Sequence, residues 1–109
     1  MLEIGQAYYR LTYADPDQTI PGLTPMIYIS DDLFPTDMPD IQTYFFQDTV
    51  SYRLIGSAAD SESSRSESDI QIQIYTATAG QLGNSVLELR EAIAALQDAL
   101  VRQKAIRRI

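Results

Sequence analysis

The chain contains no cysteine, no histidine and no tryptophan. Without cysteine it has no disulfide, no thiolate metal ligand and no thiol nucleophile. Without histidine it lacks the commonest general base and the commonest metal ligand at neutral pH. These absences predict a protein that is not an enzyme and that holds no metal and no cofactor.

Long hydrophobic runs are also missing. No apolar run approaches the roughly 18 residues that span a membrane. The first ten residues, MLEIGQAYYR, lack the charged-then-apolar pattern of a signal peptide. The sequence therefore predicts a soluble, cytoplasmic protein with no membrane partner.

Acidic residues outnumber basic residues by 15 to 8, but the excess is uneven. Residues 1–84 carry 3 Arg against 12 Asp and Glu, a net charge of −9. Residues 85–109 carry 5 Lys and Arg against 3 acids, a net charge of +2. An acidic body repels nucleic acid, so no nucleic-acid partner is expected. It suits a basic protein partner, or it serves solubility alone.

Four stretches have the apolar and β-branched pattern of strands. They are residues 5–15, 26–30, 41–47 and 70–78. Turn-forming residues fill 15–25 and 31–40, which are therefore expected to be connections. The first two strands are expected to pair antiparallel. The length of 109 residues predicts a single domain over 1–109.

Two helices are predicted. In residues 48–56, Asp48 can cap the first turn and Gly56 can end the helix, although the β-branched residues leave a strand as the alternative. Ser85 and Glu88 match the S-x-x-E capping box, which predicts a C-terminal helix over 85–108. Residues 57–69 are rich in serine and acids and are expected to form a mobile loop.

The resulting element order is β-β-β-α-β-α. It predicts an α+β fold of two layers, with an antiparallel four-stranded sheet and the long C-terminal helix packed on one face.

The C-terminal helix carries a heptad-like apolar seam. Its members recur at spacings of three and four: Val86, Leu89, Ile93, Leu96 and Leu100, flanked by Ala92, Ala95 and Ala99. The helix is longer than such a sheet is wide, so its last turns either fray or extend past the body. After Leu100 the seam becomes polar and basic residues accumulate.

Two interpretations of this basic end remain open. Cations near a helix C-terminus offset its negative end, which is a purely structural role. Alternatively, the seam and the basic end together form a protein interface. Its candidate residues are Leu89, Ile93, Leu96, Leu100, Arg102, Lys104, Arg107 and Arg108.

Tyrosine is unusually frequent, with seven residues in the chain. Aromatic side chains pair across strands, and they are also favoured in protein interfaces. On the second interpretation, Tyr8 and Tyr75 point away from the helices and form an aromatic patch on an open sheet face.

Two further groups of residues have side chains of the kinds found in metal sites or catalytic sites. Four acids between 31 and 40 (Asp31, Asp32, Asp37 and Asp40) could surround a hard cation, but they lack the spacing of a calcium loop. A serine nucleophile would have only Lys104 as its base, on an exposed helix end.

The sequence thus predicts a non-catalytic protein–protein interaction module, an adaptor or regulator that self-associates as a homodimer. The alternative is an acidic inhibitor, either an immunity-type protein or a nucleic-acid mimic, that blocks a basic site on its partner.

Overall fold

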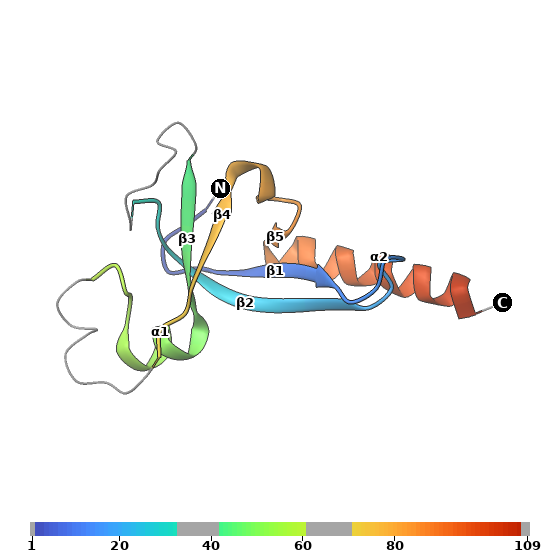
Figure 1. Ribbon diagram of the computed structural model, residues 1–109, viewed down its shortest axis with the longest axis horizontal. Helices are drawn as coiled ribbons and strands as arrows, with labels where there is room; N and C mark the ends of the chain where they lie inside the picture. Colours follow the sequence, from blue (N-terminus) through green and yellow to red (C-terminus); the bar gives the residue numbers. More distant parts are fainter. Residues whose placement is uncertain (1, 33–41, 61–70, 108–109) are drawn as a thin grey trace.

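The computed structural model describes residues 2–32, 42–60 and 71–107. They form an α+β fold, a five-stranded antiparallel sheet in the order β4-β3-β2-β1-β5 with two helices (Figure 1). The elements are β1 (Ala7–Tyr13), β2 (Pro21–Ser30), β3 (Thr43–Asp48), α1 (Thr49–Ile55), β4 (Ile74–Thr78), the 3-10 helix η1 (Ala79–Gln81), β5 (Val86–Leu87) and α2 (Leu89–Arg107). The predicted fold class and element order are confirmed, and so is the antiparallel pairing of the first two strands.

The sheet has one strand more than predicted. Residues 86 and 87 form β5, which pairs with β1 through Tyr9↔Leu87 and Arg10↔Val86. These two residues belong to the stretch assigned to the C-terminal helix. The helix therefore begins at Leu89 rather than at Ser85.

Strand β2 begins five residues earlier than predicted, because its first half contains two prolines that suggest a loop. Pro21 pairs with Tyr13 and Pro25 with Tyr9, so this half is hydrogen-bonded to β1. The neighbour on the other side, β3, pairs only with residues from Met26 onward. Proline lacks an amide hydrogen and is tolerated in a strand where one side has no partner.

One cluster of buried apolar side chains lies on one face of the sheet, which we call the inner face. Its members are Tyr8, Met26, Tyr28, Phe46, Ala77 and Val86. Phe46 lies 6.0 Å from the ring centre of Tyr8 and 5.4 Å from that of Tyr28. Tyr28 and Phe46 are also register partners, so tyrosines do pair across strands here.

The sheet curls around this core. Arg10 on β1 donates a hydrogen bond to the backbone oxygen of Thr76 on β4, and its guanidinium lies 5.8 Å from the ring centre of Tyr75. Two strands separate β1 from β4 in the sheet order, so this contact requires strong twist and coiling.

The interpretation in which Tyr8 and Tyr75 form an open aromatic face is therefore wrong. Tyr8 is 2% exposed within the core, and its hydroxyl accepts a hydrogen bond from the backbone nitrogen of Glu3 at 2.8 Å. Tyr75 is half-buried and packs against the same core. The curl of the sheet closes the face that the sequence suggested was open.

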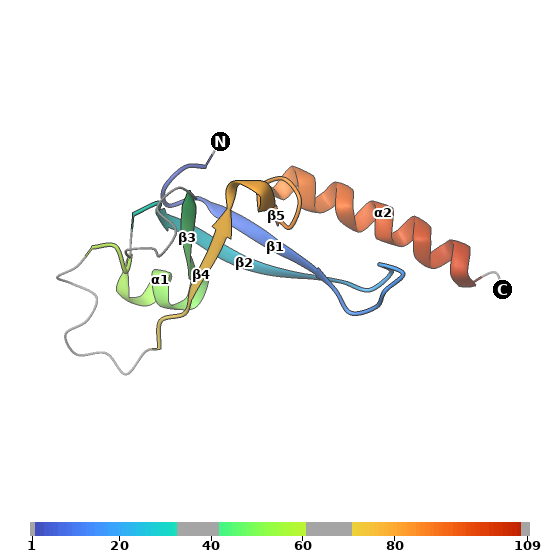
Figure 2. The same ribbon diagram turned by 45° about the horizontal axis from the view of Figure 1, so that its top comes forward.

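Both helices lie on the opposite, outer face. Strand alternation places Leu87 and Tyr9 there, and Leu87 is buried without belonging to the inner core. Helix α1 follows β3 directly, and α2 runs alongside the β1–β2 hairpin (Figures 1 and 2). The predicted packing of the long C-terminal helix on one face is confirmed.

Helix α1 confirms the helical interpretation of residues 48–56. The Asp48 carboxylate accepts a hydrogen bond from the Ser51 nitrogen at 2.9 Å, and Gly56 ends the helix with φ 83°. The helix buries Ser51 and leaves Val50 and Leu54 exposed. The reason is the fully buried Gln47, whose side-chain nitrogen donates to the Ser51 hydroxyl at 2.9 Å.

Strand β4 is shorter than the predicted strand over 70–78, because β3 ends at Asp48 and leaves no partner strand for residues 71–73. Ile70 lies outside the described residues. Of the predicted loop over 57–69, only residues 57–60 are described.

Candidate protein-binding surface on helix α2

Helix α2 begins with a hydrogen bond between its first residues. The backbone nitrogen of Glu88 donates to Oε1 of Glu91 at 3.0 Å, which satisfies one of the free amides at the helix start. The predicted capping role of Ser85 with Glu88 is wrong, because β5 intervenes. Glu91 supplies the cap three residues later.

The face of α2 that packs on the sheet consists of alanines. Ala92 and Ala99 are each 1% exposed, and Ala95 between them is half-buried. Small side chains let the helix backbone approach the sheet closely, so that α2 covers the outer face near Leu87. The helix uses its smallest residues, rather than its largest, to pack against its own sheet.

The large apolar residues of α2 lie on the neighbouring face, in solvent. Successive helical residues are about 100° apart, so Ile93 and Leu100 lie about a quarter turn from Ala92 and Ala99. We call the set Leu89, Ile93, Leu96 and Leu100 the α2 stripe; its members are 57%, 49%, 41% and 49% exposed. A single exposed leucine is ordinary, but a row of four on one helix face is an exposed apolar patch.

The outer face of the sheet is only partly covered. Leu11 and Leu23 form a register pair on this face and are half-buried, as is Ile27 on the same strand as Leu23. Pro25 lies between them on the same side and is exposed. These apolar residues lie on the same side of the sheet as α2 and are not fully buried by it.

The C-terminal turns of α2 are held by the loop of the β1–β2 hairpin. Arg102 donates from Nε to the Gln18 oxygen at 2.7 Å and from Nη2 to the Tyr13 hydroxyl at 3.2 Å. Gln103 donates to the Thr19 oxygen. The β1–β2 hairpin is longer than predicted, because β2 was predicted too short. It runs alongside α2 and so supports the C-terminal turns of the helix (Figure 2).

The hairpin loop is itself ordered by one carboxylate. Asp15 accepts hydrogen bonds from the Thr19 hydroxyl at 2.6 Å, the Thr19 nitrogen at 2.9 Å and the Ile20 nitrogen at 2.8 Å. The bond from the Thr19 hydroxyl is the largest cause that lowers the pKa of Asp15. The carboxylate is therefore ionised at neutral pH and fixes the loop that receives Arg102.

The four basic residues of the predicted interface differ in their surroundings. Arg102 forms hydrogen bonds within the chain, as described above. Lys104 is exposed. Arg107 is the last residue of α2, and Arg108 lies outside the described residues. Of the predicted basic end, Lys104 is thus the described residue that is exposed beside the stripe.

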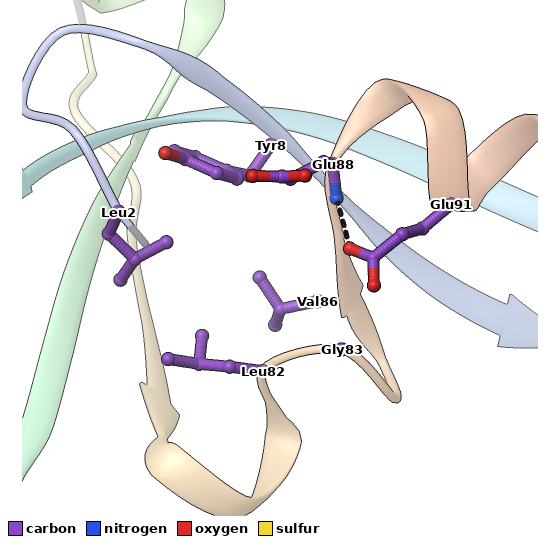
Figure 3. A pocket seen from close by; sticks show the side chains of 7 residues that line it. All are labelled: Leu2, Tyr8, Leu82, Gly83, Val86, Glu88 and Glu91. Carbon is purple, nitrogen blue, oxygen red and sulfur yellow. Dashed lines mark hydrogen bonds between the residues drawn. The ribbon is translucent and has the colours of Figure 1, made fainter.

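A separate pocket of about 270 Å³ lies where the N-terminal segment, β1 and the start of α2 meet (Figure 3). The side chains of Leu2, Leu82 and Val86 point toward one another across it, and Glu88 and Glu91 lie at its edge. Because Glu91 caps the helix through Glu88, its carboxylate has a structural role. The predicted interface residues of α2 are not among the residues that line the pocket, but Tyr8 of the predicted aromatic face is.

The acids weighed as a cation site are not brought together in the part of the chain that the structure covers. Asp31 and Asp32 are exposed, while Asp37 and Asp40 fall outside the described residues. Among residues 2–32, 42–60 and 71–107, no three acidic side chains converge in a way that could hold a metal ion. Within the same ranges, neither helix is long and apolar enough to cross a membrane.

Sequence reasoning found the stripe but missed which face of the helix packs on the sheet. The signal was present, because Ala92, Ala95 and Ala99 recur at spacings of three and four and so share a face. An all-alanine row beside a row of leucine and isoleucine predicts close packing on one side and a free apolar surface on the next.

The comparisons with known proteins add no family and no relative. No protein-family model, no curated protein and no solved structure matches this chain.

Proposed function

We propose that this chain is a non-catalytic protein-interaction module that self-associates through the α2 stripe. The observation that carries the proposal is the exposure of four aligned aliphatic side chains on a helix whose other apolar face is already packed on the sheet. Docking of a protein surface is the common reason for such a row in a soluble fold.

The size of the exposed surface supports the proposal. The chain has 7666 Å² of accessible surface, whereas a compact monomer of its mass has about 6,100 Å². Its radius of gyration is 16.4 Å, against about 13 Å for a compact domain of this length. An elongated chain with surplus surface gains more from association than a compact one.

The energy available from the stripe is of the same order as the cost of association. Burying a fully exposed aliphatic side chain contributes about 1.5–3 kcal/mol, and each stripe residue is about half exposed. Four residues on each of two copies therefore supply about 6–12 kcal/mol, and association costs about 4–15 kcal/mol in lost freedom. The two ranges nearly cancel, so the stripe alone supports weak association, and a tighter dimer requires further buried surface.

The non-catalytic part of the proposal is supported by the roles of the carboxylates. The sequence has no histidine and no cysteine. Asp15 orders the hairpin loop, Asp48 caps α1 and Glu91 caps α2. Hydrogen bonds lower the pKa of Asp15 and of Asp48, which favours ionised acceptors over proton donors.

The test is a charge placed in the stripe. We expect Ile93→Lys to convert a dimer into a folded monomer, measured by light scattering together with circular dichroism, because an ammonium group cannot be buried without a partner. The matched control is Val101→Lys, which changes another exposed aliphatic residue on the same helix, about a quarter turn or more from the stripe. A wild-type chain that stays monomeric at 100 µM would overturn the proposal.

The charge of residues 1–84, −9, favours a second candidate, an acidic inhibitor of a basic partner. Steered binding of this kind weakens steeply with ionic strength, whereas an apolar helix interface does not. A folded monomer that binds an immobilised basic protein at 50 mM salt and loses it at 300 mM salt would support this candidate instead.

A further inference from the structure

We propose that the α2 stripe is occupied by the α2 stripe of a second copy, with the two helices antiparallel. This inference rests on the proposed function and adds the occupant and its direction. It follows from three observations: the spacing of the stripe, the distribution of charge along the molecule, and the partly covered outer face of the sheet.

The sequence separations between the residues of the α2 stripe are the same when counted from either end. From Leu89 to Ile93 is four residues, from Ile93 to Leu96 is three, and from Leu96 to Leu100 is four. When two such helices pair antiparallel, Leu89 of one lies opposite Leu100 of the other, and Ile93 lies opposite Leu96. Every apolar residue then meets an apolar residue, as a self-complementary two-fold interface requires.

The charge distribution selects the antiparallel direction. The C-terminal end of α2 lies at the opposite end of the molecule from β3, β4 and α1 (Figure 1). Residues 1–84 carry a net charge of −9, whereas residues 85–109 carry +2. Two of the acids, Asp15 and Asp17, lie in the hairpin loop beside the end of α2 and offset part of its positive charge. Antiparallel pairing directs the basic end of each helix toward the acidic body of the other copy. Parallel pairing would gather two acidic bodies at one end and two basic ends at the other.

The helix dipoles favour the same direction. Each helix has a positive N-terminus and a negative C-terminus, and neighbouring dipoles attract when they point in opposite directions.

The sheet provides room for the second helix. Packed helices lie about 8–10 Å apart, so the partner helix would lie beside α2 on the same side of the molecule. There the outer face presents the half-buried Leu11 and Leu23. A stable dimer buries about 800 Å² per copy, which a stripe combined with this sheet surface supplies better than a stripe alone.

The absence of native cysteine makes disulfide trapping a direct test. Two chains are prepared, one with Leu89→Cys and one with Leu100→Cys, and they are oxidised separately and as a mixture. In the antiparallel pair, residue 89 of one copy lies opposite residue 100 of the other. Two copies of residue 89 are then about 16 Å apart along the helix axes, too far for a disulfide.

We therefore expect a cross-linked heterodimer in the mixture and at least tenfold less cross-linking of either chain alone. The control is Asp98→Cys mixed with Leu89→Cys, because Asp98 is exposed on the other side of the helix. Circular dichroism of each chain checks the fold, which substitutions at exposed positions should preserve.

The outcomes separate the two proposals. Efficient cross-linking of Leu89→Cys with itself, in a chain that is dimeric by light scattering, overturns the antiparallel arrangement and leaves self-association standing. A dimer with no cross-link from either position overturns the stripe as its interface. A chain that is monomeric throughout removes the proposed function and this inference together, and leaves the stripe to a foreign protein.

Discussion

Asp48 joins three parts of the fold at the scale of one residue. Its carboxylate accepts hydrogen bonds from the Ser51 nitrogen at the start of α1 and from the Gln73 nitrogen just before β4, each at 2.9 Å. Partial burial acts to raise its pKa, but the hydrogen bonds from Ser51 and Gln73 outweigh burial and lower the pKa. The ionised form is therefore favoured in the folded state.

This residue predicts a pH dependence of stability. Because the pKa of Asp48 is lower in the folded than in the unfolded chain, its contribution is fully present above the unfolded value of 3.8 and is lost as the pH falls through the folded value. Asp48→Ala should lower the free energy of unfolding by about 1 kcal/mol at pH 7, through loss of the cap. Urea denaturation at pH 7 and pH 2.5 measures both effects.

In the same experiment, Asp48→Asn keeps an oxygen that caps the helix but cannot ionise. It should therefore reduce the pH dependence of the free energy of unfolding, and it should affect the stability at low pH less. Asp17→Ala, at an exposed position of the hairpin loop, is the control. A cost of Asp48→Ala that is the same at both pH values would contradict the assignment of the effect to the ionised carboxylate.

At the scale of the element, α2 packs on the sheet with one face and leaves a second, apolar face exposed. Its alanine face holds the helix against the sheet, and the stripe beside it remains available. Close approach of the helix depends on small side chains at the contact, because a well-packed interface has no space for extra methylene groups.

Enlarging one alanine tests this division. Ala99→Leu should lower the free energy of unfolding by about 1–3 kcal/mol, because the buried contact is overpacked. Ala94→Leu makes the same change at an exposed position of the same helix and should change stability by less than about 0.5 kcal/mol. Thermal and urea denaturation compare the two variants. Equal stability of both would show that the alanine face does not set the helix–sheet distance.

The same elements show how far sequence periodicity reaches. It located α2 and aligned the stripe, because period and spacing are local properties of a helix. It did not assign the packed face, since alanine carries little hydropathy and the alanine row is visible only from its spacing. It also missed the first half of β2, where Pro21 and Pro25 suggest a loop and pairing with β1 makes a strand.

Long-range geometry accounts for the other differences between prediction and structure. The burial of Tyr8 follows from the curl of the sheet, which brings Arg10 on β1 to Thr76 on β4. No local pattern encodes that contact. Likewise, Arg102 has the sequence context of a free basic end, but the hairpin loop reaches it from residue 18, 84 positions earlier.

At the scale of the whole molecule, the shape and the charge both run along one long axis. The chain measures 56 Å along that axis and 34 Å and 22 Å across it. The C-terminal end of α2, with Arg102 and Lys104, lies at the opposite end of the molecule from β3, β4 and α1 (Figure 1). The hairpin loop beside that end carries Asp15 and Asp17. The two ends of the molecule therefore differ in charge, and this difference determines which arrangement of two copies is electrostatically favourable.

This asymmetry predicts the sign of a salt effect. Raising sodium chloride from 0.1 M to 1 M shortens the screening length from about 10 Å to about 3 Å. If opposite ends meet, the dissociation constant of the dimer should rise about 3- to 10-fold, as measured by sedimentation equilibrium. Lys104→Gln should reduce this rise. A dimer that tightens with salt would indicate that like-charged regions face each other.

The prolines of β2 also restrict the ways in which two copies can meet. Residues 21–25 form part of a strand whose second side has no neighbour, because β3 pairs only from Met26 onward. An exposed strand edge normally invites another strand to extend the sheet, which is the first step toward fibrils. Pro21 and Pro25 offer no amide hydrogen to such a newcomer. This stretch of the edge is therefore closed to open-ended sheet growth.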